Sequence, residues 1–380
     1  MKKVFFGAGQ IAEKEIAAGT IPEVIFDNNT ELHGTQFLSY NVSNPNDMRG
    51  FSFDKIVICS SSITDIIEQI TAIGIPSDKI EISSFIGNMA RTFSLEQYRF
   101  SGFVSSGLPS TTRSLKGGGI YSVEELEDSV VVKKVYEGNT HGMVHSGGNL
   151  IFTCQGVGIV VYHIETAQVS KVVPIPTGFR AHGIREINDH FFVACSSGDC
   201  ILQLTPDGDV EREYMLSNKI AKRGTAQHHV NDLYVTDDYI YASMFSISGN
   251  WKRGAFDGGV VEIDRLTGEV IPVITNLKMP HSITCHEGSF YVLDSYRGRV
   301  CGYDSVSMGS LGGFVRGLDF SDNFLIVGES KNRNISKLEA RNMFSAIDTR
   351  ITVIDPESKA SRSISLPRGV SEIHAVIAID

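Results

Sequence analysis

A short pattern recurs six times from residue 141 onward in this chain of 380 residues. At each occurrence a polar residue, most often histidine, precedes a small or polar residue and then an apolar one. A turn and an apolar strand follow the first five occurrences, and the sixth ends the chain. The six polar residues are His141, His182, Asn231, His281, Arg316 and His374. Successive positions differ by 41, 49, 50, 35 and 58 residues, which is the range for repeats built from four strands.

The segments between these positions have the sequence pattern of an all-β repeat. Strand-like runs such as Phe191–Cys195 and Tyr239–Ser243 alternate with Asp-Gly, Thr-Gly and Gly-Gly turns. Six starting positions predict six blades, so we expect residues 117–380 to form a six-bladed β-propeller. The terminal strand after His374 is then completed by strands from Gly119–Val135, which closes the ring.

The first 93 residues predict a different, α/β class of domain. Apolar strands are expected at Lys3–Phe6, Val24–Phe26 and Lys55–Cys59, with a helix at Thr64–Ile73 whose isoleucines share one stripe. This order predicts a small Rossmann-like domain with a parallel sheet. Residues 94–116 are rich in Ser, Gly and Thr without a sustained period, and we expect them to be a connector.

A glycine turn follows the first predicted strand. Gly7, Gly9 and Gln10 lie between this strand and a helix, and Asp27 ends the second strand, as in the phosphate-binding turn of dinucleotide folds. The spacing predicts a nucleotide or nucleotide-sugar site at these four residues. Two alternatives remain open: the glycines serve tight packing only, or the domain binds NAD.

The six repeated polar residues should converge, because the innermost strand of every blade begins on the same face beside the central channel. Four imidazoles, from His141, His182, His281 and His374, predict a divalent metal site for Zn, Mn, Fe or Ni. The same four histidines and Arg316 are the candidate catalytic residues. The alternatives are a metal-free acid/base or anion site, and imidazoles that merely plug the channel.

Loops that follow the second strand of each blade should lie on the same face as the ring. They provide candidate substrate-binding residues with cationic, aromatic and amide side chains. Together with one ring residue and its neighbour, these candidates are Asn231, His229, Trp251, Tyr296, Arg297, Lys331 and Arg333. A register shift of two residues would place His228 or His229 in the ring instead of Asn231.

Composition narrows the classes of partner. The formal net charge is -10 and no basic run occurs, which argues against nucleic-acid binding. No apolar stretch approaches the length of a membrane span, and no export segment is apparent. The six cysteines show no CxxC pair, so we expect free thiols and a cytoplasmic protein with a small-molecule substrate.

Two resemblances add to these expectations. Residues 1–90, through Phe6-Gly-Ala-Gly-Gln and Phe26-Asp-Asn-Asn, resemble the small Rossmann-like domain that precedes bacterial sugar O-acyltransferases, which implies nucleotide-sugar binding. The hexapeptide-repeat acyltransferase domain itself is absent. Residues from about 138 onward resemble a bacterial β-propeller family of unknown function, through Met279-Pro-His-Ser and Val327-Gly-Glu-Ser-Lys-Asn-Arg. Together they suggest a surface-polysaccharide locus, which is an association and not a mechanism.

These observations lead to a hypothesis of function. We expect a metal-dependent enzyme, a lyase or epimerase before a hydrolase, that acts on a sugar, nucleotide-sugar or similar anionic metabolite in the central funnel. One alternative is a non-catalytic propeller that binds glycan or protein, with an N-terminal nucleotide sensor. A second alternative is an NAD-dependent oxidoreductase.

Overall fold

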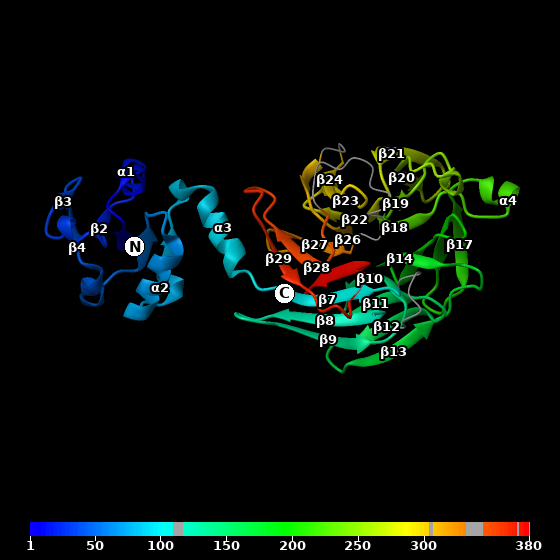
Figure 1. The fold of residues 1–380 in the computed structure, drawn as a ribbon, viewed down its shortest axis with the longest axis horizontal. Helices are drawn as coiled ribbons and strands as arrows, with labels where there is room; N and C mark the ends of the chain where they lie inside the picture. Colours follow the sequence, from blue (N-terminus) through cyan, green and yellow to red (C-terminus); the bar gives the residue numbers. More distant parts are fainter. Residues whose placement is uncertain (109–116, 304–306, 332–344, 371, 380) are drawn as a thin grey trace. The chain divides into compact units, whose positions relative to one another are not determined.

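The computed structural model describes residues 1–108, 117–303, 307–331, 345–370 and 372–379 (Figure 1). The chain divides into two compact units, Met1–Tyr98 and Arg99–Asp380. The described part of the predicted connector, 94–108, is divided between these units, and residues 109–116 lie outside the described residues. Its first part ends helix α3 of the first unit, and strand β7 at Ser101–Ser106 belongs to the second.

The first unit is an α/β domain. Its sheet has the strand order β3-β4-β2-β1-β5-β6. The pairs from β4 to β6 are parallel, whereas β3 pairs antiparallel with β4. The predicted all-parallel sheet is thus wrong at this edge, and the Rossmann-like assignment remains a prediction. The strands are β1 Lys3–Phe6, β2 Pro22–Phe26, β3 Gln36–Phe37, β4 Tyr40–Ser43, β5 Lys55–Ile58 and β6 Ile80–Ile82.

Helices α1 (Gln10–Ala17), α2 (Ile63–Ile73) and α3 (Asn88–Gln97) complete this unit with four short 3-10 turns. The 3-10 turns are η1 Thr30–Leu32, η2 Pro45–Gly50, η3 Ser77–Lys79 and η4 Ser84–Ile86. Helix α2 buries Ile66 and Ile70 in a core with Phe6 and Ile58, as its isoleucine stripe predicts. It ends at Gly74, which adopts the left-handed conformation that glycine provides at low cost.

The second unit contains six four-stranded antiparallel sheets, which confirms the predicted six blades (Figure 1). Blades 1 to 3 are β10 Thr140–Ser146, β11 Asn149–Cys154, β12 Gly158–His163 and β13 Gln168–Val173; β14 Ala181–Ile187, β15 His190–Cys195, β16 Cys200–Leu204 and β17 Val210–Met215; and β18 Val230–Val235, β19 Tyr239–Met244, β20 Gly258–Asp264 and β21 Val270–Leu277. Helix α4 (Lys219–Arg223) joins blades 2 and 3, and the turn η5 (Trp251–Arg253) lies within blade 3.

Blades 4 and 5 are β22 His281–His286, β23 Ser289–Asp294, β24 Arg299–Gly302 and β25 Ser307–Ser310; and β26 Phe314–Ser321, β27 Phe324–Ser330, β28 Arg350–Ile354 and β29 Ser361–Ser365. Blade 6 joins the two ends of the unit. Its innermost strand, β30 (Ala375–Ala378), pairs with β7, which continues into β8 (Gly119–Glu125) and β9 (Val130–Tyr136). Figure 1 shows the red C-terminal strand beside these cyan strands.

Blade 6 closes the ring as predicted, but with one strand more than the sequence indicated. Strands β8 and β9 match the predicted 119–135 region. Strand β7 was missed because its sequence, Ser-Gly-Phe-Val-Ser-Ser, has only two large apolar residues. Its Phe103 and Val104 are nevertheless buried between neighbouring strands.

Candidate functional site

The six repeated polar residues occupy equivalent places at the start of the innermost strands. In five of those strands the pairing register shifts at this point, which marks a β-bulge. A bulge adds a residue to one strand and changes the direction of its side chain. The recurring bulge therefore turns the ring residues toward the axis, where five of the six line one cavity. Those five are His141, His182, Asn231, His281 and His374.

Three of the bulges have glycine after the ring position, at Gly142, Gly183 and Gly317, because neighbouring inner strands nearly touch there. A Cβ atom on Gly142 would lie 2.5 Å from the backbone oxygen of His182 and 2.6 Å from the Cα of Gly183. The Thr153 hydroxyl stabilises the same region, since it donates to the His182 carbonyl (2.7 Å) and accepts from the Gly142 N–H (3.1 Å). Glycine in the repeated pattern is thus a packing requirement of the ring.

Three histidines from consecutive blades lie in ring-to-ring contact. The centroid of His141 is 4.2 Å from that of His374 and 4.6 Å from that of His182. His182 in turn is 5.8 Å from His229. The ring of His281 packs against Phe245 (5.3 Å) and Phe314 (5.6 Å). The structure therefore brings three of the four predicted ligands together.

Two of these imidazoles have nitrogen atoms without a hydrogen-bond partner among the described residues. Both ring nitrogens of His141 and Nε2 of His182 are buried and unpaired there. Burial lowers the pKa of His141, His182 and His281 well below the usual 6.5. The neutral form therefore prevails near pH 7, and each neutral imidazole offers one lone pair.

His281 has a defined tautomer. Its Nδ1 lies 3.0 Å from the Met279 carbonyl oxygen and 2.9 Å from Ser295 Oγ. A carbonyl only accepts hydrogen bonds, so Nδ1 carries the proton and Nε2 carries the lone pair. This is the state that a proton acceptor or a metal ligand requires.

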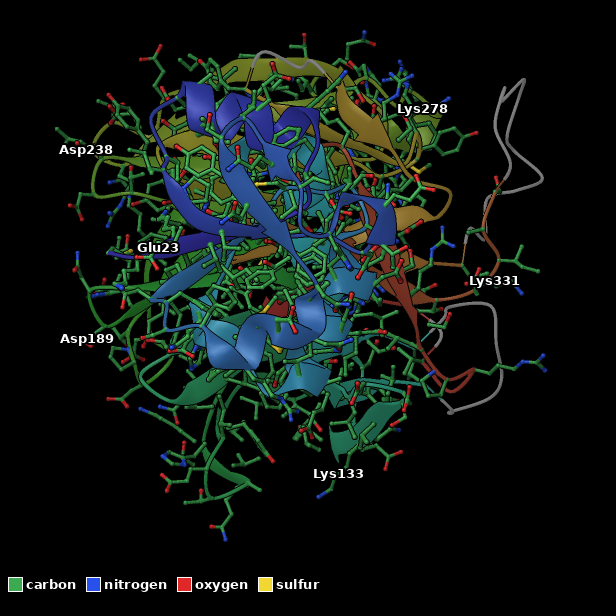
Figure 2. The ribbon with its side chains drawn as sticks, turned by 90° about the vertical axis from the view of Figure 1, so that its left-hand side faces the viewer. Glu23, Lys133, Asp189, Asp238, Lys278 and Lys331 are labelled. Atoms are coloured by element: carbon green, nitrogen blue, oxygen red, sulfur yellow. The ribbon has the colours of Figure 1, made fainter. Side chains whose placement is uncertain are left out.

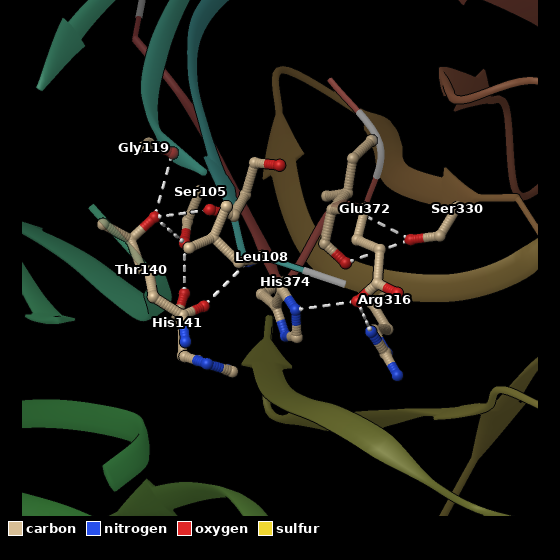
Figure 3. Close-up of polar contacts among 12 residues, drawn as sticks. Ser105, Leu108, Gly119, Thr140, His141, Arg316, Ser330, Glu372 and His374 are labelled. Carbon is tan, nitrogen blue, oxygen red and sulfur yellow. Dashed lines mark hydrogen bonds and ion pairs between the residues drawn. The ribbon is translucent and has the colours of Figure 1, made fainter. Parts of the chain in front are cut away.

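Arg316 is linked to His374 of the ring by the carboxylate of Glu372, which the sequence pattern did not identify. Its Nη1 is 3.2 Å from Glu372 Oε2, which is also 3.4 Å from His374 Nε2 (Figure 3). Both side chains of the ion pair are more than nine-tenths buried. Glu372 therefore orients His374 and compensates the charge of Arg316 beside the imidazoles.

Glu372 belongs to a second set of residues, each two positions before a ring residue. This set is Asn139, Arg180, His229, Met279, Phe314 and Glu372. Arg180 is exposed, and its charge contributes to the low pKa values of His141 and His182. Their constant distance of two residues before each ring position could have identified this set from the sequence. Their residue types differ so much, however, that no repeated pattern is visible.

One side of this second set is aromatic. His229 stacks at 4.2 Å on Trp251 and at 4.4 Å on Phe245. Tyr296 and Phe314 are buried in the same cluster, so Tyr296 is a packing element there. Blades 3 to 5 thus contribute aromatic surface, while blades 6, 1 and 2 contribute Glu372, Asn139 and Arg180.

A cavity of about 330 Å³ lies in the channel, on the side of the ring opposite to the second set of residues. Its walls are the inner strands beyond the ring residues. Named polar and aromatic residues of these walls are His145, Arg185, Asp232, Ser282, Thr284, Asp319 and Phe320. The ring histidines form its inner end, so a molecule in this cavity would contact them directly.

The predicted loop residues do not line this cavity. Arg297 forms an ion pair with Asp294 (2.8 Å) and donates to the Asn276 carbonyl (2.7 Å), which fixes its own loop. Lys331 is exposed and extends outward (Figure 2). Arg333 lies outside the described residues. Asn231 does line the cavity; its Nδ2 donates to the His229 and Pro280 carbonyls, while its Oδ1 is buried without a partner among the described residues.

The N-terminal glycine turn is held by Asp27 itself. Its carboxylate accepts from the N–H of Ala8 (2.6 Å) and of Asn29 (2.7 Å), and Gly7 has a positive φ of 109°. The side chain predicted to meet a ribose thus stabilises the turn. A Cβ atom on Gly9 would have no described neighbour within 4 Å, so close packing does not require glycine there. Gln10 begins α1 and is exposed.

Two absences apply to the part of the chain that the structure describes. No group of three or more His, Cys, Asp or Glu side chains there is already arranged to hold a metal ion. The four predicted metal ligands therefore do not form such a group, although His141 is in ring contact with both His182 and His374. No helix among these residues is long and apolar enough to span a membrane.

Known structures share the propeller fold. A protein of unknown function from Bacteroides caccae is similar at 14% identity and a TM-score of 0.51, over 74% of this chain and 99% of that one. A chain of a nidogen/laminin complex is similar at 10% identity and a TM-score of 0.51, over 73% of this chain and 97% of that one. At such identities the likeness establishes the fold alone. No curated protein matches the chain.

Sequence families match both units. Residues 1–81 match the family described as C2185-like, N-terminal, and the expected likeness to acyltransferase domains is not shown. Residues 153–380 match the family described as a domain of unknown function, DUF4915. Since this match covers more than half of the chain and most of the propeller, the chain belongs to the DUF4915 family.

Proposed function

We propose that this protein is a metal-dependent enzyme, a lyase or epimerase before a hydrolase, whose substrate is a sugar or a similar small polar metabolite. His141, His182 and His374 would hold a divalent cation at the inner end of the axial cavity. The observation that carries the proposal is the set of unpaired nitrogens on His141 and His182 among the described residues. The cavity of about 330 Å³ suits a small metabolite better than a whole nucleotide-sugar.

The energetics support a ligand at these nitrogens. A buried polar atom without a partner costs about 1–3 kcal/mol, and His141 and His182 contribute three such atoms. Neutral imidazoles with a low pKa are the form that binds divalent metals. Among the described residues these rings are not yet arranged around a common point, so binding requires them to rotate toward one.

The neighbouring residues supply the remaining parts of a proton-transfer site. A bound divalent cation would polarise a carbonyl or carboxylate oxygen of the substrate. His281 would accept a proton at Nε2, since Nδ1 is occupied as a donor. Glu372 would keep His374 oriented through Nε2 and balance the charge of Arg316.

Elemental analysis by mass spectrometry of untagged protein tests the metal proposal. We expect near-stoichiometric Zn, Mn, Fe or Ni in the wild type and its loss, by tenfold or more, in His141→Ala and His182→Ala. His163→Ala is the matched control, because His163 lies at the end of β12, away from the ring, and contacts Thr166 in its own turn. A wild type that stays empty after incubation with these ions would refute the proposal.

The aromatic cluster favours a second candidate, a non-catalytic propeller that binds a glycan or a protein. Trp251 and His229 are in tilted ring contact beside Phe245, and aromatic surfaces of this kind bind sugar rings and peptides. A binding module of this kind should keep its affinity in His141→Ala and lose it in Trp251→Ala. The enzyme should show the reverse pattern in turnover.

A further inference from the structure

Arg185 crosses the axial cavity. It begins on β14 of blade 2, and its Nη2 donates to the Ile283 carbonyl on β22 of blade 4 (3.0 Å). Its Nη1 donates to the carbonyl of Ile184 (2.8 Å). The guanidinium is therefore fixed in position by two backbone oxygens from different blades.

The charge of Arg185 has no carboxylate within ion-pair distance among the described residues. A guanidinium has five N–H groups, and two are used here, so three remain to bind a ligand. Asp232 of blade 3 is close enough to respond to this charge. Burial raises the pKa of Asp232, while Arg185 opposes that rise.

The rest of the wall offers mainly acceptors and hydroxyls. Asn231 Oδ1 is buried without a partner among the described residues. Asp319 Oδ2 accepts from the Ala378 N–H (2.8 Å), and Thr284 contributes a hydroxyl. Phe320 adds an aromatic face and is stacked on His286 at 4.0 Å with the rings nearly parallel.

This combination selects a class of ligand. A hydroxyl group both donates and accepts, so adjacent hydroxyls can satisfy a fixed guanidinium and a carboxylate at once. An apolar ligand would leave the remaining N–H groups of Arg185 without a partner. A phosphate would meet Arg185 but would be repelled by Asp232 and Asp319.

We propose that the axial cavity binds a polyhydroxyl molecule the size of one sugar ring, with Arg185 and Asp232 as its hydrogen-bonding pair. Any reaction of this ligand rests on the proposed function, whereas its binding does not. The inference narrows the substrates of the proposed enzyme to single sugars and cyclic polyols. The volume of about 330 Å³ lies at the lower end of small-molecule sites, as one ring requires.

Saturation-transfer NMR on the full chain tests this, with D-glucose, D-galactose, D-glucuronate and myo-inositol as probes, followed by titration of whichever binds. We expect at least one probe to bind, and Arg185→Gln to raise its Kd by tenfold or more. Arg299→Gln on the exposed end of β24 is the control and should leave Kd unchanged. If Arg185→Gln does not fold, Asp232→Asn carries the same test.

The assay is run before and after treatment with a chelator, which separates this proposal from the metal. Sugar binding in metal-free protein that is lost in Arg185→Gln supports the cavity site even if elemental analysis refutes the enzyme. Equal binding in wild type and Arg185→Gln would overturn the inference. So would the failure of all four probes, or binding of inorganic phosphate in their place.

Discussion

Asp199 shows how a single side chain positions part of the ring. It is fully buried, and its carboxylate accepts hydrogen bonds from three successive backbone N–H groups, those of Gln227, His228 (2.9 Å) and His229 (3.1 Å). His229 itself has a positive φ of 56°. The loop that leads into Asn231 thus depends on an acceptor supplied by the preceding blade.

Replacement of this acceptor should therefore be costly. Asp199→Asn keeps the size of the side chain but turns one acceptor into a donor that faces backbone N–H groups. We expect a loss of roughly 1–3 kcal/mol in the free energy of unfolding, measured by urea denaturation. Asp209→Asn, on an exposed turn of the same blade, should change it by less than about 0.5 kcal/mol. Equal effects of the two substitutions would contradict this role.

The sequence predicted which residues occupy the ring better than it predicted where other side chains point. The repeated pattern located all six ring positions, because the bulge requires a small residue after most of them. It did not locate Arg185 or Asp232, since the direction of a side chain beyond a bulge depends on the register of the partner strand. Glu372 was missed because its equivalents in other blades are chemically unrelated.

The innermost strands are the elements on which the site depends. They approach one another so closely at the bulges that the second bulge position of blade 1 has no room for a side chain. Gly142→Ala should destabilise the protein by roughly 1–3 kcal/mol, because the added methyl meets the backbone of His182 and Gly183. The matched control is Gly309→Ala on β25, where no described atom lies near the new methyl. Thermal denaturation of both variants measures the difference; an unaltered midpoint for Gly142→Ala would count against the packing argument.

The elements that sequence periodicity predicted are those with several large apolar residues in alternation, such as β15 and β19. Strands with few such residues were not predicted. Strand β7 is rich in serine, and β3 has only two residues, so tertiary pairing and not local propensity fixes both.

At the scale of the whole molecule, the propeller is closed where the two ends of its chain meet in blade 6. Arg362 on β29 of blade 5 binds both carboxylate oxygens of Glu125 at the end of β8, at 2.5 and 2.8 Å. Burial works against the charge of Glu125, but hydrogen bonds from Arg362 and from the Phe100 N–H outweigh it and lower its pKa. This ion pair joins the last complete blade to the closing one.

The lowered pKa gives the pair a defined dependence on pH. The stabilisation is present above the ordinary pKa of 4.5 and is lost as the pH falls through the lower pKa of the folded state. We expect Glu125→Gln to cost about 1–2 kcal/mol at pH 7, with a difference from wild type that shrinks below pH 4.5. Unfolding curves across roughly pH 3–7 test this, and a difference that grows with acidity would contradict it.

The proposed metal site consists of His141, His182 and His374 at the inner end of the axial cavity. Anomalous X-ray diffraction from crystals grown with Zn²⁺ tests it most directly. We expect one strong peak within about 2.0–2.2 Å of nitrogen atoms from these three rings. Crystals with no anomalous peak at the ring, and imidazoles in the same tilted contact, would contradict it and favour the binding module.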